Sequence, residues 1–416
     1  MSFSITSAAQ QAKKAARQIA SLTSGQKNQL LIAIAEALVA NTADILVANE
    51  KDLLAGKENA LDAAMLDRLA LDPQRIQGIA DAVMEIAGQS DPVGSISKIE
   101  RMPSGIQVGK MRIPLGVIAM IYESRPNVTI DAAALCLKAG NAVVLRGGKE
   151  ALHSNLALAE CIKTALAKQQ LDPAAVVVVP DPDRAVMNEL MTLNESIDLI
   201  IPRGGEGLIR FVSENSRIPV IQHYKGVCHL YVDSAADQDK ALNILKNGKT
   251  QRTGVCNSLE TLVVHKDIAE SFLPKAAAML AEHNTVVHAC ENSISYFAGA
   301  QPATEDDWHA EYLAMEIAVR VVDDFEQAIE HIEEYSSGHT EVIVSQDYSK
   351  TQAFIRRINS AVVMANASSR FSDGGQLGLG AEIGISTSKL HAYGPMGAES
   401  LTTEKFIVMG DGEVRA

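Results

Sequence analysis

The hydrophobic pattern changes its period along the chain and so divides it into regions. Residues 7–90 repeat apolar positions every three to four residues, as at Leu30, Ile34 and Leu38, which predicts amphipathic helices. Within this region, Asp72 followed by Pro73 is typical of the start of a helix. From residue 108 apolar and polar residues alternate, and residues 115–121 then form a continuous apolar run. Such a run predicts a strand buried on both faces of a parallel sheet.

Strand-like and helix-like segments alternate from there to about residue 366. This alternation predicts two doubly wound α/β domains with a boundary near His229, and such sheets bind ligands at the carboxyl ends of their strands. A glycine-rich stretch follows, and residues 401–409 form a last apolar strand with no partner nearby in sequence. We expect that strand to pair with another subunit or with an excursion hairpin.

Composition narrows the possible classes of protein. A chain of 416 residues exceeds the usual size of a single core, so two domains are expected. The net charge of −14 argues against binding to nucleic acid or to an anionic membrane, and no apolar stretch is long enough to span a bilayer. The five cysteines lack any CxxC pair, which indicates neither a disulfide framework nor a metal site. Since no signal peptide is evident either, we expect a cytoplasmic protein.

One cysteine has neighbours that suit nucleophilic chemistry. Cys256 lies on a polar segment, residues 250–258, just ahead of an apolar strand, with Lys249 and Arg252 close in sequence. Nearby cations favour the reactive thiolate. The alternative is a half-buried cysteine that caps a strand.

Two glycine turns at predicted strand ends are candidates for phosphate binding. Residues 145–150 include Arg146 and Lys149, and residues 201–207 include Arg203, Gly204 and Gly205 ahead of a helix. Glycines let backbone N–H groups approach an anion. No G-x-G-x-x-G follows a strand, but two such turns on consecutive sheet edges favour a nucleotide site.

Several motifs, in order, resemble the aldehyde dehydrogenase superfamily, and within it the branch that reduces L-glutamyl 5-phosphate in proline biosynthesis. The resemblance implies an aldehyde dehydrogenase-like α/β fold with two doubly wound domains and a small β oligomerisation element. It implies an NADP-binding Rossmann-like domain (residues 1–98 and 116–228), a catalytic domain (229–366), the oligomerisation element (99–115 and 400–416) and a glycine-rich return segment (367–399). The matching motifs are residues 114–118, 123–129, 145–149, 201–205, 250–257, 322–343 and 374–382.

The resemblance also implies roles for single residues. Cys256 is the expected nucleophile, and Asn127 is expected to donate to the oxyanion, with a helix N-cap as its alternative role. Arg146 matches a lysine that touches the adenosine ribose. Lys149 falls where NAD-preferring relatives carry a glutamate, so NADPH is implied, the alternative being a solvated turn lysine. Glu311 matches a glutamate that holds the nicotinamide ribose, although an isolated surface charge is its alternative.

The substrate and partners follow from the same resemblance. Arg125, Lys249 and Arg252 are candidates for the substrate's phosphate or carboxylate, and Glu382 is a candidate for its ammonium group. We expect a homo-oligomer, a dimer or tetramer, with substrate channelling from glutamate 5-kinase.

A missing carboxylate separates reduction from oxidation. Oxidising relatives carry a general-base glutamate in the segment that matches residues 220–226, but residues 217–231 contain no Asp or Glu, and Gln222 stands near the expected position. This favours reduction, although His223 or His229 could substitute as a base. The alternatives are an NAD(P)-dependent oxidiser of another aldehyde and a non-catalytic scaffold.

Overall fold

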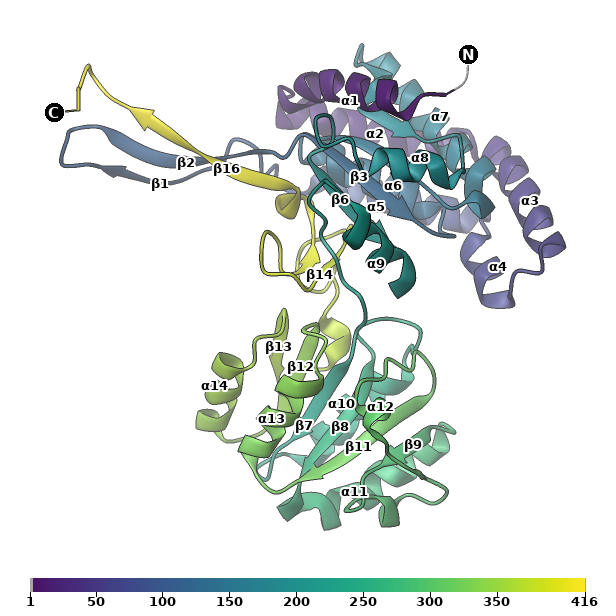
Figure 1. The fold of residues 1–416 in the computed structure, drawn as a ribbon, viewed down its shortest axis with the longest axis vertical. Helices are drawn as coiled ribbons and strands as arrows, with labels where there is room; N and C mark the ends of the chain where they lie inside the picture. Colours follow the sequence, from purple (N-terminus) through teal and green to yellow (C-terminus); the bar gives the residue numbers. More distant parts are fainter. Residues whose placement is uncertain (1–2, 416) are drawn as a thin grey trace. The chain divides into compact units, whose positions relative to one another are not determined.

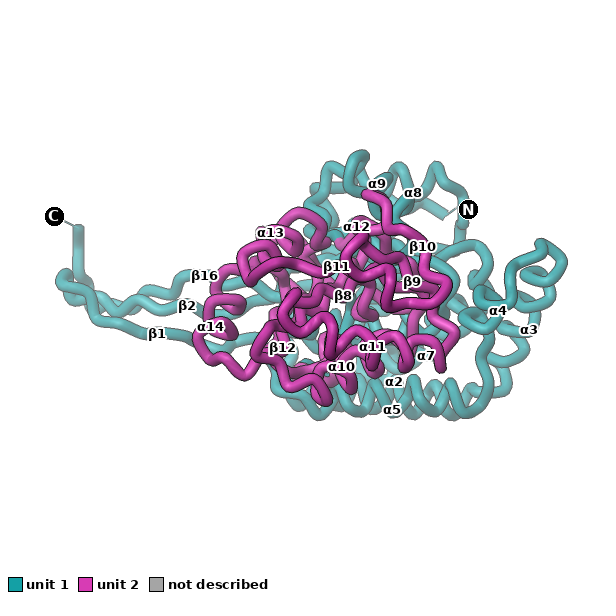
Figure 2. Tube along the Cα trace, turned by 90° about the horizontal axis from the view of Figure 1, so that it is seen from below, with its two compact units in different colours: residues 1–222, 378–384, 396–416 teal, residues 223–377, 385–395 magenta. Residues whose placement is uncertain are grey.

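The computed structural model describes residues 3–415, which form two compact units (Figure 2). Unit 1 runs to Gln222 and also includes residues 378–384 and the chain from Met396 onward. Unit 2 comprises residues 223–377 and 385–395. The chain therefore leaves unit 1 after Gln222 and returns to it in the glycine-rich segment.

Unit 1 is built on a parallel sheet with strand order β5-β4-β3-β6. β3 (Val117–Tyr122), the continuous apolar run of the sequence, is buried along its whole length. The chain leaves β3 toward β4 on one side and comes back to β6 on the other. The carboxyl ends of β3 and β6 are therefore a switch point, where open α/β sheets bind ligands. The other strands are β4 (Ala142–Arg146), β5 (Val176–Val178) and β6 (Leu199–Arg203).

The helices of unit 1 confirm the helical repeat seen in the sequence. α2 buries Leu30, Ile34 and Leu38. α5 begins as predicted, with the Asp72 carboxylate accepting the Arg75 backbone N–H at 2.7 Å and Pro73 in the first helical position. The helices are α1 (Ile5–Ala20), α2 (Ser24–Ala40), α3 (Thr42–Glu58), α4 (Ala63–Leu69), α5 (Pro73–Gly88), α6 (Asn127–Lys138), α7 (Leu152–Lys168), α8 (Arg184–Leu190) and α9 (Glu206–Asn215).

Among the described residues, no single helix is long and apolar enough to cross a membrane. α2 and α3 reach that length and composition only as a pair, and the chain bends by 69° between them.

An antiparallel arm extends from unit 1 (Figure 1). It consists of β1 (Ile96–Arg101), β2 (Gln107–Pro114) and β16 (Thr402–Met409), with β2 in the middle. β16 is the terminal strand of the sequence, and its partner is the excursion hairpin: Thr402 pairs with Pro114, and Met409 with Gln107. Phe406 and Val408 on β16 are 71% and 60% exposed, so the arm carries apolar side chains that unit 1 does not cover.

Unit 2 is built on a fully parallel sheet with strand order β10-β9-β11-β8-β7-β12-β13. Its core packs apolar side chains from the central strands against the helices, with Phe272 of α11 completely buried. The strands are β7 (Cys228–Val232), β8 (Leu259–His265), β9 (Val286–Ala289), β10 (Gln301–Pro302), β11 (Glu316–Val322), β12 (Thr340–Val344) and β13 (Val362–Ala365). The helices are α10 (Gln238–Thr250), α11 (Lys266–Glu282), α12 (Glu305–Trp308), α13 (Phe325–Tyr335) and α14 (Tyr348–Arg357), and the return segment carries the short strands β14 (Gly384–Ser386) and β15 (Gly394–Met396).

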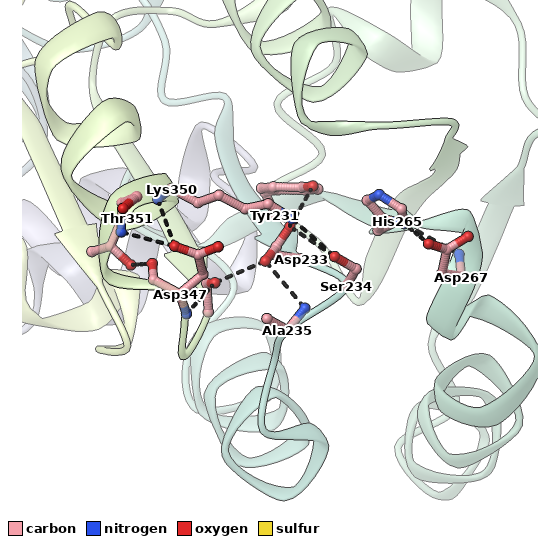
Figure 3. Close-up of polar contacts among 11 residues, drawn as sticks. Tyr231, Asp233, Ser234, Ala235, His265, Asp267, Asp347, Lys350 and Thr351 are labelled. Atoms are coloured by element: carbon pink, nitrogen blue, oxygen red, sulfur yellow. Dashed lines mark hydrogen bonds and ion pairs between the residues drawn. The ribbon is translucent and has the colours of Figure 1, made fainter.

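A polar network closes the carboxyl end of β7 (Figure 3). Asp233 is fully buried and accepts hydrogen bonds from Lys350 Nζ (2.7 Å) and Ser345 Oγ (2.8 Å). Burial acts to raise the pKa of Asp233, but the hydrogen bonds from Lys350 and Ser345 outweigh it and hold the pKa below its usual value. The network joins the carboxyl end of β7 to Ser345 and Lys350, which follow β12.

Candidate active site

The loop between α10 and β8 presents Cys256 at the amino end of the unit 2 sheet. Cys256 is half-buried, and the residues on either side of it are held in place. Asn257 Nδ2 donates to the Ser372 carbonyl at 2.8 Å, and the Ser258 N–H donates to the Val255 carbonyl at 3.1 Å. A parallel sheet usually binds ligands at its carboxyl edge, which the sequence led us to expect, but this loop precedes β8 instead.

The backbone beside Cys256 is packed so closely that only glycine fits. A Cβ added to Gly226 would lie 2.1 Å from the Cys256 carbonyl oxygen. Gly226 in turn donates its N–H to Glu311 Oε1 at 2.8 Å. Glu311, the expected ribose ligand, therefore lies within unit 2 and holds the glycine that packs against the nucleophile.

Two histidines lie beside the Cys256 thiol. One ligand atom each of His223, Cys256 and His339 lies within 4.8 Å of the others. His223 precedes β7 and His339 precedes β12, so three neighbouring strands of the sheet bring the group together. Burial lowers the pKa of His339 to about 3, and His223 adds to the shift, so the His339 imidazole stays neutral.

The two histidines that the sequence left open thus differ in the structure. His229 is fully buried on β7, and its Nδ1 lies 2.9 Å from Glu341 Oε2, which gives it a structural partner. Of the two, His223 is the one with a ring nitrogen within 4.8 Å of the Cys256 sulfur. Its spacing from Cys256 in sequence carried no signal for this contact.

The basic residues around Cys256 do not all face solvent. Lys249 is completely buried, with Nζ 2.8 Å from Glu260 Oε2. The structure therefore does not support its expected role in substrate binding. Burial lowers the pKa of Lys249 and raises that of Glu260 to about 7, while each partner opposes the effect on the other. Arg252, in contrast, is exposed on the nucleophile loop.

Arg370 is a basic residue of this site that the sequence did not indicate. Its Nε donates to Gln251 Oε1 at 3.0 Å, whereas Nη1 is buried with no hydrogen-bond partner among the described residues. Burial lowers the pKa of Arg370 and nearby Arg252 lowers it further, while Asp373 and the Cys256 thiol oppose the shift. A partly unsatisfied guanidinium at this position can accept an anionic group.

In unit 1, the first glycine turn follows β4 as predicted. Arg146 is half-buried, and its Nη2 donates to the Pro182 carbonyl at 2.7 Å. Its Nε is buried with no hydrogen-bond partner among the described residues, which leaves a donor for a ligand. Lys149 begins a short 3-10 turn (Lys149–Ala151) and is exposed.

The second glycine turn joins β6 to α9 at the switch point. The Gly205 N–H donates to Glu123 Oε2 at 3.0 Å, and a Cβ on Gly204 would lie 2.5 Å from the same carboxylate oxygen. Arg203 Nη1 lies 3.7 Å from Glu382 Oε1, so the structure pairs the expected cofactor and substrate residues with each other.

Asn127 is the first residue of α6, and Pro126 occupies the N-cap position. The alternative N-cap role of Asn127 is therefore wrong. Its Nδ2 donates to Asp131 Oδ2 at 2.9 Å, which uses one of its two amide hydrogens. Burial raises the pKa of Asp131 to about 6, although the bond from Asn127 and the charge of Arg203 lower it. Arg125, just before this helix, is half-buried.

Comparisons with known proteins show which family this chain belongs to. A model of the aldehyde dehydrogenase family matches residues 3–296, and the fold of both units is of that kind. The chain belongs to the aldehyde dehydrogenase family.

The similar proteins within that family narrow the group further. The chain is 61% identical to a gamma-glutamyl phosphate reductase of Colwellia psychrerythraea, covering 99% of each chain, and 60% identical to one of Idiomarina loihiensis, covering 98% of this chain and 97% of the other. The crystal structure of gamma-glutamyl phosphate reductase from Thermotoga maritima is 42% identical, with a TM-score of 0.97 over 99% of this chain and 100% of that one. Within the aldehyde dehydrogenase family, the chain is therefore a member of the gamma-glutamyl phosphate reductase group.

Proposed function

We propose that this protein reduces L-glutamyl 5-phosphate to L-glutamate 5-semialdehyde with NADPH, releasing phosphate, as a step of proline biosynthesis. The observation that carries the proposal is the full-length similarity to gamma-glutamyl phosphate reductases. The half-buried Cys256 beside His223 supports it, because acyl transfer to a thiol needs a nucleophile with a proton acceptor close by.

The proposed chemistry begins at the Cys256 sulfur. The thiolate attacks the γ-carbonyl, the C–O bond to phosphate breaks, and a thioester remains. Asn127 and the Cys256 backbone N–H are the proposed donors to the oxyanion, each worth about 3 kcal/mol. A nicotinamide cofactor, when bound, supplies the hydride. The resulting hemithioacetal then loses its C–S bond, which releases the aldehyde and regenerates the thiol.

The residues of the two glycine turns fit a nicotinamide cofactor. Among residues 3–415, the buried Arg146 Nε has no hydrogen-bond partner, and Gly205 is open, since no atom of another segment lies within 4 Å of an added Cβ. We propose Arg146, Lys149, Arg203, Gly204, Gly205 and Glu311 as cofactor-binding residues. The exposed ammonium of Lys149 favours a 2′-phosphate, and hence NADP, over a bare ribose.

Three arginines are the proposed receptors for the substrate's anionic groups. Arg125 and Arg252 are the candidates already indicated by the sequence. Arg370 takes the place of Lys249, whose side chain is buried. Glu382 is proposed to bind the substrate ammonium.

If Arg370 binds an anionic group of the substrate, Arg370→Ala raises KM for the acyl phosphate and Arg370→Lys restores part of the lost affinity. An unchanged KM in both variants removes Arg370 from the site.

The alternative function is oxidation of another aldehyde by the same fold. It requires a base for water, and Gln222 at the expected position has an amide side chain that accepts the Ser213 hydroxyl. An amide is no base, which favours reduction.

The exposed apolar side chains of the arm suit contact with a second copy of this chain. We therefore propose a homo-oligomer, a dimer or tetramer, in the cytoplasm, where a thiol such as Cys256 stays reduced. Channelling from glutamate 5-kinase is part of the same proposal.

Light scattering of a Phe406→Asp, Val408→Asp variant tests whether the arm forms the oligomer. A mass equal to that of the parent protein contradicts a role for the arm. A coupled assay tests channelling, which fails if added scavengers intercept all of the acyl phosphate.

The reverse reaction gives the most direct test of the function. The purified chain is incubated with L-glutamate 5-semialdehyde and NADP, with and without phosphate. We expect NADPH to form only when phosphate is present, because phosphate must cleave the thioester. Equal rates without phosphate identify an oxidiser, and no reaction in either case contradicts the proposal.

A further inference from the structure

His223, Cys256 and His339 form a compact donor set within unit 2. They come from three loops at the amino ends of β7, β8 and β12, strands that are neighbours in the sheet order β8-β7-β12. Their spacing in sequence has no metal-binding pattern, which is why the sequence indicated no metal site. The parallel sheet alone brings one sulfur and two ring nitrogens within 4.8 Å of one another.

The hydrogen bonds of His339 determine which ring nitrogen has a free lone pair. Nδ1 lies 2.7 Å from Thr340 Oγ1, and the Thr340 hydroxyl donates its proton to Ser372 Oγ at 2.8 Å. Thr340 can therefore only accept from His339, so Nδ1 carries the ring proton. Nε2 then has a lone pair, and it is buried with no hydrogen-bond partner among the described residues.

This arrangement is the one that metal-binding histidines adopt. Such a histidine usually donates its second ring N–H to a fixed acceptor, which orients the ring and fixes the tautomer. His339 is 1% exposed and held by Thr340, so its lone pair is oriented before any ligand arrives.

The donor atoms select the class of ion. One thiolate and two imidazoles suit zinc, and a site with three protein ligands leaves a fourth position open. Bond lengths of about 2.0–2.3 Å require the donor atoms to move closer than 4.8 Å. His223 lies outside the helices and strands, in residues 221–227, so it is the ligand of the three that the sheet constrains least.

We propose that His223, Cys256 and His339 bind a zinc-class divalent cation, and that the bound ion blocks the nucleophile. On binding, the Cys256 S–H bond breaks, a sulfur–metal bond forms and the proton passes to the buffer, without any redox change. The inhibitory part of the proposal rests on the proposed function of Cys256, whereas the binding part does not.

Cobalt(II) is the probe for binding, because it replaces zinc in tetrahedral sites and gives a thiolate charge-transfer band. The reduced, metal-free full chain is titrated with Co²⁺ anaerobically. We expect one equivalent to produce the band, excess Zn²⁺ to abolish it, and Cys256→Ser to lack it. His223→Gln weakens binding at least about tenfold, and Thr340→Val, which removes the acceptor for His339 Nδ1, weakens it about 10- to 100-fold.

His153→Gln is the matched control, since His153 is an exposed histidine of α7 in unit 1. It should bind Co²⁺ like the parent protein. Circular dichroism verifies that each variant is folded. A band of equal strength in Cys256→Ser, or no band in the folded parent protein, overturns the proposal.

Inhibition is measured separately on the NADPH-dependent reaction. Zn²⁺ should inhibit the parent protein reversibly, EDTA should restore its activity, and His223→Gln should need at least about tenfold more Zn²⁺ for half-inhibition. Zn²⁺ should also protect Cys256 from iodoacetamide, as measured by peptide mapping. A chain that binds Co²⁺ through Cys256 but reduces no acyl phosphate refutes the proposed function and leaves the metal site standing. A chain that reduces the acyl phosphate but gives no cobalt band refutes the metal site and leaves the proposed function standing.

Discussion

At the scale of single residues, reactivity depends on which groups the fold places beside Cys256. The sequence identified Cys256 from its loop and its cationic neighbours, and the loop is where the structure holds it. Sequence proximity misjudged Lys249, because a helical residue adjacent to a loop can point into the core. It named His223 only as one of two possible bases and could not find His339 or Arg370, because these residues reach the site through strand order and not through spacing along the chain.

Cys256→Ser should abolish nearly all activity, because a serine hydroxyl is far less acidic than a thiol and forms no thioester. Cys290→Ala is the matched control, since Cys290 is also half-buried in unit 2. Steady-state rates for both variants check the prediction. Full activity after complete alkylation of Cys256 would rule out the covalent mechanism.

Lys149→Glu should weaken NADPH binding selectively, because the carboxylate repels a 2′-phosphate and accepts hydrogen bonds from a ribose. Losing one charged contact should shift the preference by about 1.5–3 kcal/mol. The ratio of kcat/KM for NADPH and NADH measures the shift, with Lys168→Glu, another lysine of unit 1, as a control. If both cofactors lose equally, Lys149 has no part in selecting the cofactor.

At the scale of elements, the Lys249–Glu260 pair joins the end of α10 to the beginning of β8. It therefore holds both ends of the nucleophile loop at a fixed separation. Both side chains are fully buried, so the pair is protected from solvent. The pair fixes the geometry of the loop more than it stabilises the fold, since a buried ion pair adds little folding free energy compared with apolar side chains of similar size.

Lys249→Met should destabilise unit 2 by about 3–5 kcal/mol, because it leaves the Glu260 carboxylate buried without its cation. Adding Glu260→Leu should recover most of that loss. Urea unfolding curves of the single and double variants measure both effects. A double variant as unstable as the single one would show that the pair itself stabilises the fold.

For the whole molecule, most of the architecture could be predicted from local patterns. Helical repeats, the buried β3 run and the α/β alternation predicted the fold class, because these signals are local. The pattern left two partners open for β16, another subunit or an excursion hairpin, and it did not indicate that residues 378–384 return to unit 1. Periodicity contains no information about which distant strands become neighbours.

Buried neutral histidines should make unit 2 sensitive to acid. Burial, with His229 and Arg320, lowers the pKa of His331 from 6.5 to about 2, and burial with His223 lowers that of His339 from 6.5 to about 3. Both groups therefore contribute stability fully above pH 6.5, and the contribution falls as the pH drops toward the folded-state pKa. Each should change the unfolding free energy by about 1.4 kcal/mol per pH unit between pH 6 and 4.

His331→Gln should remove one of these two contributions. Urea unfolding at pH 6.5, 5.5 and 4.5 measures how steeply the unfolding free energy falls with pH. This dependence should be smaller by about 1.4 kcal/mol per pH unit in the variant. An identical slope in both proteins would place the acid sensitivity elsewhere.

The strands of the arm leave the ribosome far apart in time. Gln107 of β2 emerges early, but its partner Met409 follows roughly 300 residues later. At about 5–20 residues per second, the β1–β2 hairpin waits roughly 15–60 s with one edge open. An open strand edge invites pairing with other chains. The charged residues of the hairpin, such as Lys110 and Arg112, which later pair with Glu404, therefore protect the nascent chain before they stabilise the finished one.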